Sequence, residues 1–174
     1  MDVYNKQVIE YVTVAAETCL LFEHVNECTR NEFIVRSLRL LPLLYAKTVV
    51  LGVPEMVLDD APERFVTEED YQYVRESVET LLGNDNVYLE VFRPEMKYSD
   101  TPIAAFISED LADIYQELKD FAASYRIGVE DIMNDALAVS LEAFAEHWGQ
   151  KLLNAMRALH ALRYSEEFDS YEEE

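Results

Sequence analysis

The sequence predicts an all-α protein, a helical bundle of about five helices that ends in one long C-terminal helix. Apolar residues recur at intervals of three and four along most of the chain, which is the period of an amphipathic helix. Only four glycines and five prolines occur in 174 residues, whereas β-rich proteins need many turns and therefore more of both.

The first two helices are expected over residues 4–25 and 30–51. The first carries apolar side chains at helical spacing, at Val8, Val12, Ala15, Cys19 and Phe22. The second opens with a capping box, in which Thr29 accepts from a backbone N–H and Glu32 reaches back. Pro42 removes one intrahelical hydrogen bond, so we expect a kink or a break near Leu41.

Two long connections are predicted, over residues 53–66 and 84–107. Between them a helix is expected over 68–82, capped by Thr67. Residues 87–92 have strand character but are too few for a sheet of their own, so an extended segment or a helical turn is expected there. Long connections in compact domains are often functional, and a site could lie in either.

The last two helices are predicted over residues 109–125, capped by Ser108, and 129–163. The second is long for a globular protein, and its apolar stripe rotates near Gly149, where a bend is expected. Residues 165–174 hold six acids and no base, which predicts an acidic disordered tail after a single helical domain over 1–164.

Charge and cysteine content narrow the classes of partner and compartment. The formal net charge of −21 repels phosphate backbones and anionic lipid surfaces, so neither a nucleic acid nor a membrane is an expected partner. Arg39 and Lys47 interrupt the most apolar segment, which is too short to span a bilayer. Cys19 and Cys28 have no redox or zinc spacing, as expected of a cytoplasmic protein.

The acidic side chains of the 109–125 helix suggest a site. They fall on one side of the helix, beside its apolar stripe, at Asp110, Asp113, Glu117 and Asp120. Such carboxylates can hold a divalent cation when a second helix adds a ligand, and His147 is expected to face inward. The predicted metal ligands are therefore Asp110, Asp113, Glu117 and His147. The alternative is a solvated acidic face and a histidine that is hydrogen-bonded within the core.

Three runs in the chain resemble one known family. They are LPLLYAKTVVLGVP at 41–54, SEDLADIYQELKDF at 108–121 and AEHWGQKLLNAMRAL at 145–159. Together they resemble an uncharacterised bacterial domain-of-unknown-function family, numbered five thousand and sixty-three, over nearly the whole chain to residue 163. The DLADIY and HWG runs are its more specific marks, although Glu109 replaces one acid of an expected doubled Asp. The resemblance implies a bacterial cytosolic helical protein and no reaction, and it directs attention to residues within the matching runs, namely Asp110, Asp113, Tyr115, His147 and Trp148.

Two functions from different classes follow. The first is a protein-interaction or regulatory module that needs no cofactor and binds another protein or a second copy of itself. The sequence favours it because it contains no Gly-rich phosphate loop, no G-x-S-x-G elbow and no HExxH motif. The alternative is a metal-dependent hydrolase, with Asp110, Asp113, Glu117 and His147 around a divalent ion. Tyr115 and Trp148 complete the candidate site, and core or interface packing also explains both.

Overall fold

The computed structural model describes residues 1–90, 97 and 101–172. Within these residues the predicted all-α bundle is confirmed, with five helices and one small sheet. The α-helical segments are α1 (Lys6–Glu23), α2 (Arg30–Val49), α3 (Glu68–Leu82), α4 (Ile107–Arg126), α5 (Glu130–Ala143) and α6 (Gly149–Arg163). A π-helical turn (Phe144–Trp148) joins α5 to α6, so these two form the long C-terminal helix. No helix in the described part is both long and apolar enough to cross a membrane.

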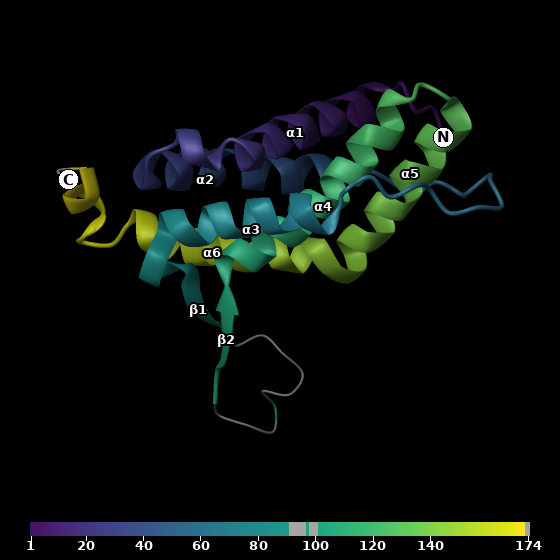
Figure 1. Cartoon of the computed structure of the whole chain (residues 1–174). Coiled ribbons are helices and arrows are strands. Elements are labelled where there is room, and N and C mark those ends of the chain that lie inside the picture. Colours follow the sequence, from purple (N-terminus) through teal and green to yellow (C-terminus); the bar gives the residue numbers. More distant parts are fainter. Residues whose placement is uncertain (91–96, 98–100, 173–174) are drawn as a thin grey trace.

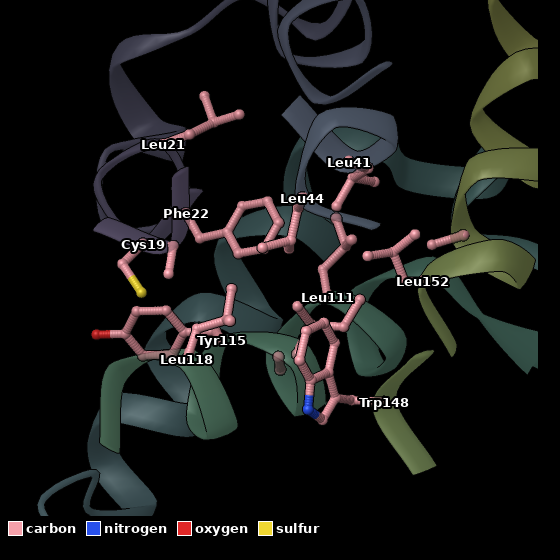
Figure 2. Packing of buried hydrophobic residues seen from close by; sticks show 14 of the residues in the cluster. Cys19, Leu21, Phe22, Leu41, Leu44, Leu111, Tyr115, Leu118, Trp148 and Leu152 are labelled. Atoms are coloured by element: carbon pink, nitrogen blue, oxygen red, sulfur yellow. The ribbon is translucent and has the colours of Figure 1, made fainter. Parts of the chain in front are cut away.

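Helix α4 is the centre of the bundle. It packs against α1, α3, α5 and α6, while α1 and α2 pair with each other (Figure 1). Figure 2 shows Phe22 of α1, Leu44 of α2 and Leu111 of α4 gathered with Trp148 in the core. Each buried side chain of this size stabilises the fold by about 1.5–3 kcal/mol, so the apolar stripes hold the helices together.

The predicted capping box is present at the start of α2, at Thr29 with Glu32, and the predicted cap of α3, Thr67, also forms a capping box, with Asp70. Pro42 does not break α2, which continues to Val49. Pro42 lies on the exposed side of that helix, where water can bond the carbonyl that the proline leaves without a partner.

The connection between α3 and α4 differs from the prediction. Strand β1 (Val87–Glu90) pairs antiparallel with β2 (Ile103–Phe106), with Val87 opposite Phe106, and residues 91–96 and 98–100 lie outside the described part. The extended segment expected at 87–92 is present at Val87–Glu90, but its pairing was not predicted because the partner strand comes from a short apolar run with little strand signal of its own.

Ser108 is not the cap of α4, which begins at Ile107. It is buried instead and exchanges two hydrogen bonds with the side chain of Asn86. The Asn86 amide donates to its Oγ (2.9 Å), and its backbone N–H donates to the Asn86 Oδ1 (2.8 Å). This pair fixes the start of α4 against the foot of the hairpin.

Figure 1 shows the bend expected near Gly149 as a change of direction between α5 and α6. The wider π turn brings the carbonyl of Phe144 to the backbone N–H of Gly149, five residues on. A Cβ added at Gly149 would lie 2.6 Å from that carbonyl oxygen and 2.9 Å from the Phe144 ring. Glycine therefore allows the turn to close.

We expect Gly149→Ala to lower the free energy of unfolding by about 2 kcal/mol, because the added methyl group displaces backbone rather than a flexible side chain. Gly52→Ala is the matched control, since a Cβ at Gly52 meets nothing within 4 Å. Urea denaturation of both variants measures the difference. Equal stabilities would show that the π turn does not require a glycine.

Residues 168–172 are structured, within the segment that was expected to be a disordered tail. A short 3₁₀ helix covers Phe168–Glu172, and Phe168 is buried. The Asn31 amide donates to the Phe168 carbonyl (2.8 Å), and the guanidinium of Arg30 lies over the Tyr171 ring. The two aromatic side chains anchor a segment whose acidic composition predicted disorder.

Candidate functional site

The four acids of α4 that the sequence singled out lie in two separate clusters. The first, the Lys151 cluster, comprises Asp110, Asp113, Lys151, Tyr71 and Tyr88. The Lys151 ammonium lies 2.7 Å from Asp113 and 3.7 Å from Asp110. Tyr71 of α3 donates to Asp113 (2.7 Å), and Tyr88 of β1 donates to Asp110 (2.5 Å). The cluster thus joins α3, α4, α6 and the hairpin.

Burial dominates the electrostatics of Asp110, which is 4% exposed. Burial is the main reason why the pKa of its carboxyl is raised to about 6. The hydrogen bond from Tyr88 and the charge of Lys151 lower this pKa, whereas the nearby Asp113 and Glu90 raise it. The pKa of Lys151 is also raised, because its contacts with Asp113 and Asp110 outweigh a burial effect that acts in the opposite direction. Both groups are therefore charged at neutral pH.

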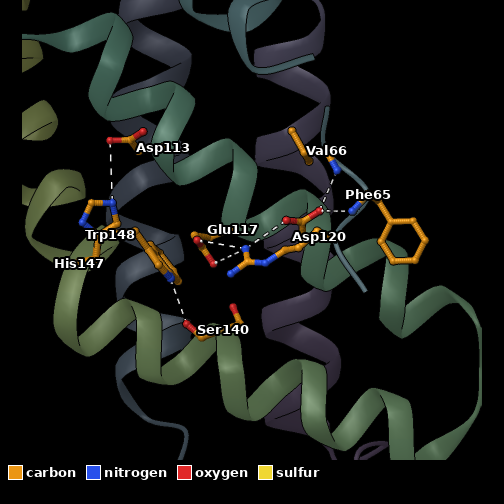
Figure 3. A network of polar contacts seen from close by, with 9 residues as sticks. Phe65, Val66, Asp113, Glu117, Asp120, Ser140, His147 and Trp148 are labelled. Atoms are coloured by element: carbon orange, nitrogen blue, oxygen red, sulfur yellow. Dashed lines mark hydrogen bonds and ion pairs between the residues drawn. The ribbon is translucent and has the colours of Figure 1, made fainter. Parts of the chain in front are cut away.

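The second cluster, the Arg64 cluster, comprises Glu117, Asp120, Arg64 and two backbone amides. Arg64 lies 3.4 Å from Glu117 and 3.2 Å from Asp120. Asp120 also accepts from the backbone N–H groups of Phe65 (2.7 Å) and Val66 (2.9 Å), as Figure 3 shows. This cluster fixes the end of the α2–α3 connection to α4.

The four predicted metal ligands do not converge. Glu117 contacts Arg64, whereas Asp110 and Asp113 face Lys151, whose ammonium takes the place between them that a cation would need. No group of three or more His, Cys, Asp or Glu side chains in the described part is arranged to hold a metal ion. A solvated acidic face is equally wrong, since these acids are largely buried and each has a partner.

His147 does not face inward. Its side chain is 52% exposed, and its Nε2 lies 3.9 Å from Asp113. The error lies in the reference residues, because Ile132 and Ala143 are only partly buried, whereas the neighbouring Trp148 continues the buried side set by Leu141. Trp148 is fully buried and donates from Nε1 to the Ser140 carbonyl (3.0 Å), so it is a core residue (Figure 3).

Tyr115 points toward α1 and away from both clusters. Its hydroxyl donates to Glu23 (2.9 Å), which Lys119 also contacts at 2.9 Å. Of the six candidate residues, the structure therefore brings only Asp110, Asp113 and His147 together.

A further buried acid fixes the middle of the connection between α2 and α3, here called the 50–66 loop. Asp135 of α5 is fully buried and accepts from the backbone N–H groups of Val57 (2.8 Å) and Leu58 (2.9 Å). Its neighbour Asn134 donates to the Glu55 carbonyl (2.7 Å). Burial alone would raise the pKa of Asp135, but these amide hydrogen bonds outweigh it and lower the pKa.

The 50–66 loop exposes apolar side chains although its backbone is held at two places. Val57 is 58% exposed and Met56 is 42% exposed. The other large apolar side chains exposed on the loop are Val50, Val53, Leu58 and Phe65. Acidic residues lie among them, at Glu55, Asp59, Asp60 and Glu63, and all four are exposed.

Sequence reasoning missed Lys151, Arg64 and Asp135 as partners. Lys151 lies one helical turn after His147, and Arg64 lies in a loop, so neither position signals a contact with α4. Asp135 did carry a signal, because it is an acid within the apolar run MNDALAV. An acid on the buried side of a helix must find donors, and a nearby long connection is a ready source of backbone N–H groups.

Fold and site together define a helical bundle whose central helices use buried carboxylates to fix a long, partly apolar loop. The family described as "Domain of unknown function (DUF5063)" matches residues 2–165, and the chain belongs to this family. The crystal structure of protein BF1032 from Bacteroides fragilis is similar, with 44% sequence identity and a TM-score of 0.84. The similarity covers 94% of this chain and 96% of that one. None of the curated proteins compared with the chain matches it.

Proposed function

We propose that this protein is a cytoplasmic protein-interaction module that presents the 50–66 loop to a partner protein. The observation that carries the proposal is the fixed backbone of this loop beneath exposed apolar side chains. Asp135 and Asp120 each accept two of its backbone N–H groups, while Val57, Met56 and their apolar neighbours stay exposed.

A fixed loop suits binding because it loses little conformational entropy when a partner docks. Exposed apolar groups bordered by polar ones are typical of protein interaction sites. The acids Glu55, Asp59, Asp60 and Glu63 favour a partner whose apolar surface is bordered by basic groups. The two unpaired cysteines support a reducing compartment.

Site-specific photo-crosslinking in cells tests this proposal. A photoreactive amino acid is placed at Val57, and in parallel at Glu79, an exposed position on α3. We expect one discrete adduct from position 57, identified by mass spectrometry as a protein with a basic-rimmed apolar surface, and none from position 79. Asp135→Ala, which releases the loop backbone, should weaken the adduct. The same products from both positions, or none from position 57, would contradict the proposal.

A further inference from the structure

A groove between α1 and α4 is another partly apolar surface in the described part of the molecule, and the Arg64 and Lys151 clusters do not contribute to it. Its open volume is about 560 Å³, within the range of about 300–1,000 Å³ that is usual for binding sites. Small side chains, Ala16, Ala122 and Ala123, form much of its lining, and Leu20 is 49% exposed beside them. Such a surface admits side chains from a partner at close range.

The charge of this groove differs from that of the whole chain. It is lined by two of the 14 basic residues, Lys119 and Arg126, and by only one of the 35 acids, Glu23. Lys119 is paired with Glu23 at 2.9 Å, so the positive charge of Arg126 is in excess. In a protein with a net charge of −21, this groove is a place that attracts an apolar segment with acidic residues.

The 50–66 loop has that composition. Met56, Val57 and Leu58 supply exposed apolar groups, and Asp59 and Asp60 follow directly. We infer that the occupant of the α1/α4 groove is the 50–66 loop of a second copy of this chain. The inference rests on the proposed function of the loop and names its partner.

The contact has to be made between two molecules. Asp120 and Asp135 hold the loop backbone against α4 and α5, and Figure 1 shows the loop extending past α5, away from the body of the bundle. The groove is formed by α1 with α4. Two chains that exchange their loops reciprocally would close a dimer, because each contact joins one loop to one groove.

A complementation experiment tests the inference by sedimentation equilibrium, with a monomer mass of 20.2 kDa as reference. The groove variant combines Leu20→Glu with Arg126→Glu and keeps its loop. The loop variant combines Val57→Ser with Asp59→Lys and Asp60→Lys and keeps its groove. All substituted positions are exposed, and thermal unfolding confirms that both variants fold. Leu153→Glu, at an exposed apolar position on α6, is the matched control.

We expect the wild type and the Leu153→Glu control to associate and each of the two variants to be monomeric. Mixing the variants should restore a one-to-one complex, because the loop of one still fits the groove of the other. A wild type that stays monomeric, or variants that do not complement each other, would overturn the inference. If the wild type associates but the variants do not complement, the two copies contact each other through the same surface on each chain. A monomeric wild type with a foreign adduct at position 57 would overturn only the inference and leave the proposed function standing.

Discussion

Asp135→Ala is expected to lower the free energy of unfolding by about 3 to 4 kcal/mol. The carboxylate is fully buried and accepts hydrogen bonds from Val57, Leu58 and the Asn134 amide. Its removal leaves two backbone N–H groups and one of the two amide hydrogens of Asn134 without an acceptor, and each buried unsatisfied donor costs about 1–3 kcal/mol. The expected loss lies near the lower end of the summed cost of these donors, because the two backbone donors belong to exposed loop residues that water can partly reach.

Urea denaturation measures the loss, and hydrogen exchange locates it. The amides of Val57 and Leu58 should exchange faster in the variant. The protection of amides in the core of α4 should fall only by the loss of global stability that urea denaturation measures. Asp131→Ala is the matched control, because Asp131 lies on the same helix, one turn earlier, and is exposed. A stability loss below 1 kcal/mol, or equal losses in both variants, would show that Asp135 does not hold the loop.

The helices and the hairpin show what sequence reasoning can and cannot supply. Helical periodicity and capping boxes predicted α1 to α4 because those signals are local, as at Thr29 and Thr67. The hairpin was missed because strand pairing depends on residues far apart in sequence, and 103–106 has little signal without its partner. A bend was placed at Gly149, but the π turn before it was not predicted, and His147 was expected to face inward although its side chain is exposed.

The candidate site failed for a related reason. The spacing of Asp110, Asp113 and Glu117 correctly put three acids along one side of α4, but spacing alone does not identify what neutralises them. Their partners, Lys151 and Arg64, come from a helix and a loop that only the tertiary fold brings near. A buried acid therefore predicts that a partner exists, while the identity of the partner, a metal ion, an ammonium group or a row of backbone amides, is decided by packing.

Asp110 provides the second large expected effect, which depends on pH. Its pKa is about 6 in the folded protein against an ordinary value of 3.8, so the folded state favours the protonated form. This contribution to stability is fully present below about pH 4. It is lost as the pH rises through 6, and its size is about 3 kcal/mol, since one pKa unit corresponds to about 1.4 kcal/mol.

Asp110→Asn should remove this dependence, because the amide stays neutral and its oxygen still accepts from Tyr88. The difference in unfolding free energy between the variant and the wild type, measured in urea from pH 4 to pH 7, should shift by about 2.5 kcal/mol in favour of the variant, because at pH 4 the unfolded carboxyl is already partly ionised. Taking the difference cancels the pH dependence of groups that do not interact with Asp110. Glu109→Gln, an exposed neighbour on α4, is the matched control. A flat difference for Asp110→Asn, or a shift that favours the wild type at pH 7, would mean that Lys151 and Tyr88 compensate fully for the burial of this carboxylate.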